Sequence, residues 1–406
     1  MSRVPRFGRF RRFSSAVLRN LNDEGHWCYS SEWWGGNGAE GHTVFRSTSQ
    51  HGNGIISVTT YPSSRPATEE WPLVEGWLQE RYAKIHPELK HIEKFKVLGY
   101  QWRALRFNDD TRQSTVKTMA AYREADPMSL YLMQLPHCLA VPYLKSMISC
   151  GLTTLSSFGY DLSKSVTGRT TMNVLCIGHG GGSLPLFLAT KIKGAIVDVV
   201  EIDPVVISAS IKAMGFPPST VVVELDGTSV SQPSNTGGFP WGNIHNQLHL
   251  HIADAEDFVI HTSKTYDLIF IDAYDGGDIF PPKLWDIHGP FLKSLRSRLH
   301  PAHGTVVVNL HGSNILGTSF LPMGRYVGQV CRAYKEHMGF TFSVSVPWLC
   351  NLTLVASAGT GLARAAHLSG DLVLNALVSE SDTVEYLLDL PFSCLQYIKR
   401  DFLLVD

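Results

Sequence analysis

The chain has 406 residues, which is enough for two or three domains of ordinary size. Apolar residues make up 44% and charged residues 17%, a composition that supports a large core and excludes bulk disorder. Its 35 basic and 36 acidic residues leave a formal net charge of −1, which argues against a nucleic-acid-coating protein. No run approaches the roughly 18 apolar residues of a membrane helix, so no membrane partner is expected either.

The cysteine and histidine positions predict neither a disulfide scaffold nor a metal site. The seven cysteines are odd in number, scattered, and form no CxxC pair. His249 and His251 share one face of a predicted strand, but no cysteine or carboxylate cluster accompanies them at ligand spacing. We therefore interpret these histidines as structural and expect no metal.

The N-terminus has the composition of an address signal. Six arginines and no acidic residue occur in the first 22 positions, a pattern typical of organelle transit peptides. The run Arg11-Arg12-Phe13-Ser14-Ser15 resembles a mitochondrial processing site. Residues 1–25 are thus predicted to be a transit peptide and the protein to be mitochondrial. A chloroplast or a cytoplasmic location, the latter with a solvated basic tail, is the alternative.

Residues 26–118 are predicted to form a small, mostly β, N-terminal domain. The β-branched and alternating runs in it are separated by Gly, Ser, Asn and Asp, which favour turns. The expected elements are strands at His42–Arg46, Ile55–Tyr61 and Lys96–Phe107, and a helix at Trp71–Tyr82.

Residues 119–170 are predicted to be a helical connector. Met128–Ser149 is long, apolar and poor in turn residues, which favours a helix packed between domains. Pro136 and Pro142 are expected to bend or break it, because proline lacks the amide hydrogen that a helix interior needs.

From about residue 171 short apolar strands alternate with helical segments, which is typical of an open parallel α/β sheet. Residues 171–360 are therefore predicted to be a Rossmann-like domain. Residues 217–246 are rich in Pro, Gly, Ser and Asn and are predicted to be a surface insertion in this domain. Residues 361–406 are predicted to be a helical tail. The expected strands are Asn173–Ile177, Ala195–Ile202, Leu248–Ala253, Tyr266–Ile271, Thr305–Leu310, Phe340–Val346 and Leu352–Ala356.

The strongest motif is the run Val174–Leu184, in which an apolar strand enters a glycine-rich turn and then a helix. Gly178, Gly180 and Gly182 allow a tight turn and a close ligand approach, and Ser183 is expected to cap the helix. Glu201 ends the next predicted strand, where a doubly wound sheet places a carboxylate for ribose hydroxyls. Together these features predict a nucleoside site.

The choice of nucleoside follows from the loop. The dinucleotide fingerprint has Gly or Ala at the position of Ser183, which disfavours NAD, and no lysine follows the loop as ATP binding requires. The GxGxG spacing suits S-adenosylmethionine. Two further strands end in acids, Asp254 on one and Asp272 and Asp275 on the other, and all would face the same crevice.

Residues 171–310 resemble the class I S-adenosylmethionine-dependent methyltransferases, and within them the spermidine synthase-like branch. The runs VLCIGHGGGSLP, VVEIDP, HIADAEDF and YDLIFIDAYDGG carry the resemblance, in that order and at that spacing. The glycine loop and VEIDP are most similar to those of methyltransferase-like proteins that modify a translation elongation factor. Arg106–Val116, with Gln113-Ser114, resembles the last strand of the N-terminal domain in this branch, a domain that makes polyamine synthases dimeric.

The resemblance implies roles for matching positions, with S-adenosylmethionine as cofactor and residues 171–360 as its binding domain. Asp272 and Asp275 keep the spacing of the polyamine synthases' DxxD motif, whose first acid helps to deprotonate the attacking amine. Ile202 would pack on the adenine ring. Asp254 would accept a hydrogen bond from the amino group of adenine, and the backbone of Ala255 would contact the adenine beside it. Glu201 would bind the ribose of the cofactor. The methionine part of the cofactor would be lined by Gly178, Gly180 and Gly182.

Departures from polyamine synthases leave several functions open. Their glycine loop carries an aspartate where this chain has Gly181, and their following Arg-Glu pair falls on Leu186 and Phe187. The first hypothesis is a methyltransferase that acts on an amine, on a protein or free. The second is an aminopropyltransferase, the third a non-catalytic nucleoside-binding protein, and an NAD-dependent oxidoreductase is a remote fourth. We expect His179 to be a loop or surface residue and Tyr274 to serve packing.

Overall fold

The computed structural model describes eleven stretches of the chain. These are residues 41–63, 68–89, 94–109, 111–218, 221–223, 229–230, 241, 244–311, 322–346, 351–359 and 369–405. The predicted transit peptide at 1–25 and most of the predicted insertion at 217–246 lie outside the described residues. Within these stretches, no helix is long and apolar enough to cross a membrane.

The first sheet is an antiparallel meander of five strands in the order β1-β2-β3-β4-β5. Helix α3 (Trp71–Ile85), flanked by the 3-10 turns η2 (Thr68–Glu70) and η3 (Pro87–Leu89), joins β2 to β3. Asn108 and Asp109, with φ of 52° and 62°, form the tight turn between β3 and β4. The strands are β1 (His42–Thr48), β2 (Ile55–Pro62), β3 (Phe95–Phe107), β4 (Thr111–Arg123) and β5 (Asp126–Gln134).

The predicted helix over Met128–Ser149 is wrong in its first half. Residues 126–134 form strand β5, which pairs with β4, and helix α4 (Pro142–Ser157) begins only at Pro142. The backbone hydrogen bonds to β4 stabilise the extended state of this apolar run, which its composition alone did not reveal. Arg106–Val116 spans the turn between β3 and β4, so it is not the last strand of the first sheet.

The second sheet has ten strands in the order β15-β13-β14-β12-β11-β6-β7-β10-β8-β9. Six neighbouring strands, from β12 to β8 in this order, are parallel, whereas β14, β13, β15 and β9 each pair antiparallel with their neighbours. The predicted fold class, a Rossmann-like sheet preceded by a small β-rich unit, is confirmed. The parallel strands are β6 (Met172–Ile177), β7 (Ala195–Glu201), β8 (Val221–Val223), β10 (Leu248–Ile252), β11 (Leu268–Ile271) and β12 (Thr305–His311); the others are β9 (Ser229–Val230), β13 (Phe340–Ser345), β14 (Asn351–Ser357) and β15 (Leu403–Leu404).

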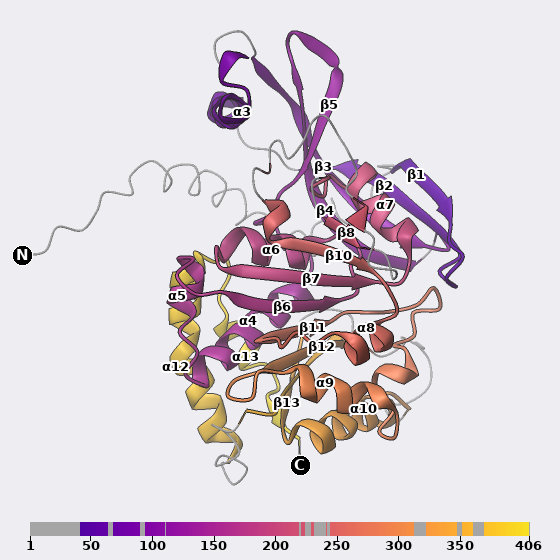
Figure 1. Ribbon diagram of the computed structural model, residues 1–406, viewed down its shortest axis with the longest axis vertical. Coiled ribbons are helices and arrows are strands. Elements are labelled where there is room, and N and C mark those ends of the chain that lie inside the picture. Colours follow the sequence, from indigo (N-terminus) through magenta and orange to yellow (C-terminus); the bar gives the residue numbers. More distant parts are fainter. Residues whose placement is uncertain are drawn as a thin grey trace, which may run out of the picture.

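Helices cover both faces of the second sheet (Figure 1). α4, α5, α6, α12 and α13 lie on one side and α8, α9 and α10 on the other, each group with its own apolar core. The predicted helical tail is broken at its end, because the last residues pair with β13 as β15. The bounds are α5 (Leu162–Val166), α6 (Ser183–Lys191), α7 (Pro204–Ala213), η4 (Ile244–Asn246), α8 (Ala255–His261), η5 (Pro282–Leu284), α9 (Pro290–Arg298), α10 (Pro322–Met338), α12 (Gly370–Leu388) and α13 (Leu395–Ile398).

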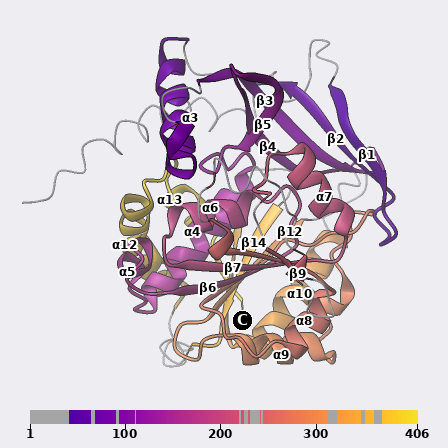
Figure 2. The same cartoon turned by 45° about the horizontal axis from the view of Figure 1, so that its top comes forward.

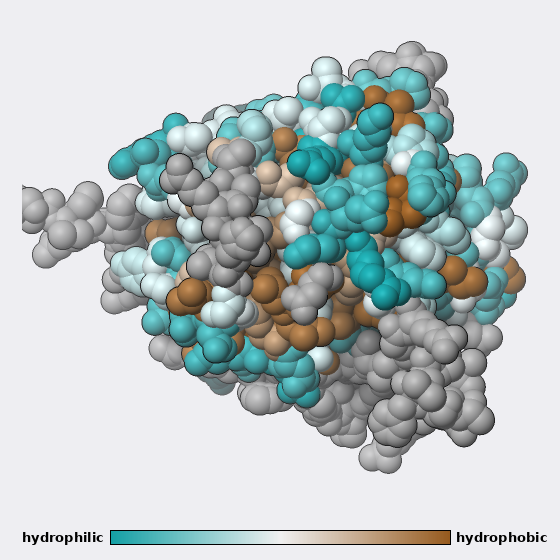
Figure 3. All heavy atoms as spheres, turned by 90° about the horizontal axis from the view of Figure 1, so that it is seen from below, coloured by the Kyte–Doolittle hydropathy of each residue, from teal (hydrophilic) through white to brown (hydrophobic). Residues whose placement is uncertain are grey.

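The outer surface mixes polar and apolar side chains. In the view from below, hydrophilic and hydrophobic residues are interspersed (Figure 3). Large hydrophobic side chains that are individually exposed, such as Leu372 and Leu403, are normal on a folded protein and mark no site by themselves.

β6 lies between β7 and β11, so the chain winds away from it in both directions. This switch point opens a crevice beyond the carboxyl ends of these strands, where open α/β sheets bind ligands. The first sheet stands over the crevice, and α7 lies between the two sheets (Figure 2).

A buried carboxylate joins the first sheet to the second. Asp203, fully buried at the start of α7, accepts hydrogen bonds from Ser49 Oγ at 2.5 Å and from Asn53 Nδ2 at 2.8 Å. Its other oxygen caps α7 by accepting the Val205 amide at 2.9 Å. The β1–β2 turn is thereby held against the end of β7.

We expect the substitution Asp203→Ala to lower the free energy of unfolding by about 2–4 kcal/mol, because it removes a helix cap and leaves buried donors without an acceptor. Urea unfolding followed by circular dichroism measures the loss. The matched control is Asp161→Ala, which removes the exposed cap of α5 and should change stability far less. Equal losses in the two variants would contradict the anchoring role of Asp203.

Candidate nucleoside-binding site

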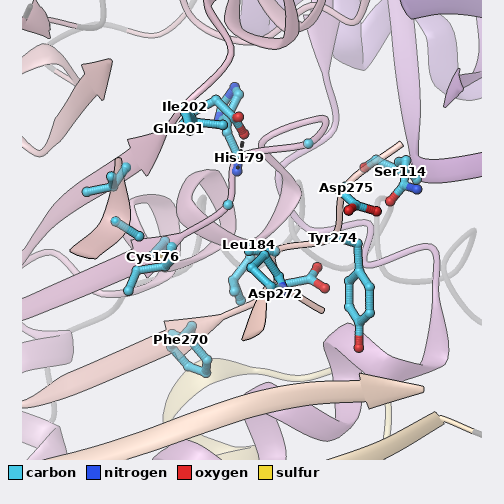
Figure 4. Close-up of a pocket in the computed structure, with 18 of the residues that line it drawn as sticks. Ser114, Cys176, His179, Leu184, Glu201, Ile202, Phe270, Asp272, Tyr274 and Asp275 are labelled. Carbon is cyan, nitrogen blue, oxygen red and sulfur yellow. Dashed lines mark hydrogen bonds between the residues drawn. The ribbon is translucent and has the colours of Figure 1, made fainter. Parts of the chain in front are cut away.

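A pocket at the switch point collects the predicted site residues (Figure 4). All of them line it except Gly182, which lies behind the loop as the N-cap of α6. The first sheet also contributes to the wall, through Gln113 and Ser114 of β4 and through His51 and Asn53 of the β1–β2 turn. Sequence reasoning had noted Gln113-Ser114 only as part of a strand.

The glycine loop needs glycine at each predicted position. Gly178, Gly180 and Gly182 have φ of 91°, 52° and 78°, a region that side chains rarely adopt. A Cβ at Gly178 would also meet the carbonyl oxygen of Asp272, and one at Gly182 would meet the ring of Phe216. The loop therefore packs directly against the end of β11.

The helix after the loop is capped differently from the prediction. Ser183 is the first residue of α6 rather than its cap, and its hydroxyl accepts a hydrogen bond from Gln134 Nε2 at 3.2 Å. Gly182 takes the cap position because its left-handed backbone already turns the chain into the helix. Ser183 thus ties α6 to the end of β5 in the first sheet.

Glu201 ends β7 and faces the glycine loop. One carboxylate oxygen accepts the His179 amide and the other accepts the Asp203 amide, each at 3.0 Å. Burial raises the pKa of Glu201 to about 7, and the two amides oppose this by stabilising the ionised form. An ionised carboxylate keeps lone pairs for further donors, so Glu201 could also hold two ribose hydroxyls.

His179 lies in the glycine loop, as expected, but it is buried rather than at the surface. Its Nε2 lies 2.7 Å from Ser210 Oγ, and its ring packs edge-on against Phe216 at 4.8 Å. The Ser210 hydroxyl donates to the Ile207 carbonyl, so Nε2 of His179 is the donor to Ser210. Burial lowers the pKa of His179 to about 3, and the ring therefore stays neutral and supports the loop.

The far end of the pocket combines an exposed apolar side chain with an acid. Ile202 is 42% exposed although it is aliphatic, which suits a position that a flat ring would cover. Asp254 caps α8 through the Glu256 amide at 2.8 Å and forms an ion pair with Lys283. Burial acts to raise the pKa of Asp254, but Lys283 and the amide outweigh it and the pKa is lowered. Ala255 lines the wall beside this acid.

Lys283 was missed from the sequence. It lies in η5, downstream of the strand-end motif, and nothing in its local pattern marks it as a partner of Asp254. The rings of His249 and His251, predicted to be structural, both approach the buried Asp198, which also binds Lys264.

Asp272 follows β11 and is held by two donors. Asn309 Nδ2 donates to its Oδ1 at 2.9 Å, and the Tyr143 hydroxyl donates to the same carboxyl group. Asn351 Nδ2 in turn donates to Asn309 Oδ1 at 3.1 Å, which fixes the amide of Asn309 with its NH2 toward Asp272. Burial raises the pKa of Asp272, while these hydrogen bonds and His311 act to lower it.

Asp275 is bound differently from Asp272. It is exposed, and its Oδ1 accepts the Gly277 and Ile279 amides, each at 2.9 Å, which closes the turn after β11. Burial is the main cause of the upward shift of the Asp272 pKa. Tyr274 packs as expected: its ring stacks on His311 at 4.1 Å and its hydroxyl donates to the Asn309 carbonyl.

Gly181 leaves no room for the acid that polyamine synthases carry there. A Cβ at this position would lie 2.8 Å from Ser114 Oγ, Met214 Cε and Val116 Cγ1. Side chains of β4, together with Met214, therefore fill the space that a side chain at position 181 would need.

Comparisons with known proteins identify relatives of part of the chain. Over 151 residues, 35% of this chain, it is 27% identical to the bovine (Bos taurus) eEF1A lysine and N-terminal methyltransferase, and the human (Homo sapiens) protein of that name is 27% identical over 147 residues. These matches span only 18% and 17% of the relatives' lengths. The chain matches no protein-family model.

Solved structures with a similar fold include human methyltransferase-like protein 13 in complex with SAH. It is 20% identical, with a TM-score of 0.44, and the comparison covers 62% of this chain and 95% of that one. Spermidine synthase from Thermotoga maritima is 13% identical with a TM-score of 0.39, and covers 73% of this chain and 88% of that one.

We expect the affinity for S-adenosylhomocysteine to rise roughly tenfold between pH 6 and pH 8 as Glu201 ionises. Two amides and two ribose hydroxyls are four donors, and only the ionised carboxylate offers each of them a lone pair. Because the pKa of about 7 lies above the usual value of 4.5, the proton is lost within this window. Isothermal titration calorimetry measures the affinity.

The control is Glu201→Gln, whose affinity should be lower and should not change over the same pH range. An affinity of the unaltered protein that is the same at pH 6 and pH 8 would contradict this assignment of Glu201.

Proposed function

We propose that the chain is an S-adenosylmethionine-dependent methyltransferase of the spermidine synthase-like type that methylates an amine on a protein. The observation that carries the proposal is one pocket with Glu201 at its nucleoside end and the hydrogen-bonded carboxylate of Asp272 on its wall. The matched curated relatives, which are named for lysine and N-terminal methylation of eEF1A, support an amine acceptor on a protein.

The residues present fit the cofactor. The glycine loop has no side chains where the methionine part of the cofactor would lie. Glu201 has lone pairs to accept hydrogen bonds from the ribose, and Ile202 exposes an apolar side chain that adenine could cover. Asp254 retains acceptor capacity for the adenine amino group beside its contacts to Lys283 and the Glu256 amide. When bound, S-adenosylmethionine supplies an electrophilic methyl group to an in-line nucleophile.

Asp272 is proposed to orient the acceptor amine and to receive its proton, because an amine attacks only as the free base. The donors Asn309 and Tyr143 fix the direction of the carboxylate, which matters because small misplacements cost rate. The upward shift of the Asp272 pKa moves it toward the range of an effective base. Asp275 is proposed to shape the turn beside the acceptor rather than to transfer protons.

The proposal also includes a location in the cell and an oligomeric state. We propose mitochondrial targeting by residues 1–25, supported by six arginines and no acidic residue in the first 22 positions; chloroplast or cytoplasm is the alternative.

We also propose a homodimer formed through the first sheet, supported by the exposed side chains of Leu98, Met128 and Leu130 on β3 and β5. Nucleic acid and membranes are not proposed partners.

We expect the full chain to bind S-adenosylmethionine more tightly than decarboxylated S-adenosylmethionine, in calorimetric titrations of each ligand. Gly181 stands where aminopropyltransferases carry an acid, and the space around it is filled by other side chains. The aminopropyl group of the decarboxylated ligand would therefore lack an acidic partner for its ammonium charge. A preference for the decarboxylated ligand would favour the aminopropyltransferase instead, and binding of neither would leave the non-catalytic alternative.

We expect Asp272→Asn to slow methyl transfer by roughly 10²–10⁴-fold, the range for loss of a general base, without weakening cofactor binding. The assay follows tritiated methyl groups from S-adenosylmethionine into the proteins of a mitochondrial extract. Asp275→Asn keeps a side-chain oxygen for the two turn amides, so it serves as the matched control and should retain most of the activity. Equal loss in both variants would contradict the separate roles of the two acids.

A further inference from the structure

The end of β11 opposite the nucleoside pocket carries a second cluster of potential ligands. Asp267 precedes β11, and His300 and His303 precede β12, its parallel neighbour in the sheet. One ligand atom from each of the three residues lies within 4.8 Å of the other two. His303 Nε2 is 2.7 Å from Asp267 Oδ1, and the rings of His300 and His303 lie face to face at 3.8 Å.

The backbone around this cluster is held firmly. Asp267 Oδ2 accepts the Asn173 amide at 2.8 Å, which leaves Oδ1 facing the histidines. The Gly304 amide donates to the His300 carbonyl at 2.8 Å, and a Cβ at Gly304 would come within 2.6 Å of the same residue. Two short, fixed loops therefore bring three ligand side chains together without any rearrangement of the chain.

We propose that Asp267, His300 and His303 form a binding site for a divalent transition-metal ion, of which Zn²⁺ is the best match. Two imidazole nitrogens and one carboxylate oxygen are a donor set that Zn²⁺ accepts, with water in the remaining position, whereas Mg²⁺ and Ca²⁺ prefer oxygen ligands alone. The site is separate from the nucleoside pocket by the whole length of β11 and does not depend on the proposed methyltransferase activity.

Backbone amides orient two of the three proposed ligands. Nδ1 of His300 accepts the Ala302 amide at 3.3 Å, so Nε2 is the nitrogen that would release its proton and bind the ion. The Asn173 amide acts as an outer partner that orients the carboxylate of Asp267.

Binding requires one adjustment of the side chains. The two rings are nearly parallel, at 14°, and parallel rings cannot both direct a nitrogen lone pair at one ion. At least one ring must turn about its Cβ–Cγ bond, and both histidines are only partly buried, which leaves room for this rotation.

The cluster around Asp198 has the same residue types but already contains a cation. Asp198 is also approached by two histidines, His249 and His251, but the ammonium group of Lys264 lies 3.0 and 2.9 Å from its two oxygens. That carboxylate therefore already has a cation, whereas the Asp267 carboxylate is bound, within the described part of the chain, by the imidazole of His303 and the Asn173 amide. The Asp198 cluster thus provides a matched control with the same residue types.

The test is a calorimetric titration of the chelator-treated full chain with ZnCl2 at pH 7.5, with Co²⁺ absorption spectra as a second readout of ligand type. We expect the affinity for Zn²⁺ to fall by about tenfold or more in His300→Gln and in His303→Gln. His303→Cys, which replaces one ligand atom by another, should retain binding, so a loss caused by misfolding is told apart from a loss of ligation.

The control variants His251→Gln, in the Asp198 cluster, and His261→Gln, on the surface, should bind Zn²⁺ as the unaltered chain does. Affinity for S-adenosylhomocysteine should be the same in every variant, so this result stands apart from the proposed function. The proposal is overturned if the unaltered chain binds no Zn²⁺, or if His300→Gln and His303→Gln both leave the affinity unchanged.

Discussion

The contact on which the site depends is the pair of hydrogen bonds from the amides of His179 and Asp203 to the two oxygens of Glu201. A buried carboxylate is costly unless donors surround it, and here the donors are the backbone of the glycine loop and of the turn into α7. The same acid therefore fixes the loop, ends β7 and presents its remaining lone pairs to the pocket. The next carboxylate along the chain, Asp203, extends this arrangement to the first sheet through Ser49 and Asn53.

The first sheet completes the pocket rather than merely preceding it. Ser114 approaches the glycine loop so closely that Gly180 and Gly181 have little space for a side chain. On the other side of the pocket, Asn108 Nδ2 donates to the Gly276 carbonyl at 3.0 Å, which ties the β3–β4 turn to the turn that follows Asp275. The shape of the pocket thus depends on how the two sheets meet as well as on the motif in the second sheet.

The sequence was informative where a local pattern determines the structure. The strand, glycine loop, helix and acid around Gly178 and Glu201 have positions that the backbone itself dictates, and they were predicted together. It was uninformative where distant segments decide: the apolar run at Met128 became a strand only because β4 offers it hydrogen bonds. Lys283 and Asn309 were missed for the same reason, since each acts on an acid from another element.

Asp272 and Asp275 show how far environment, rather than residue type, sets a role. They lie three positions apart in one motif, yet the first is held by side chains from α4 and β12 while the second accepts two amides of its own turn. Amides favour the charged, acceptor-only form and fix a backbone, whereas burial beside side-chain donors yields a carboxylate that can exchange a proton. Their spacing in the sequence made the two acids look equivalent, and only the packing around β11 distinguishes the proposed base, Asp272, from the acid that closes a turn, Asp275.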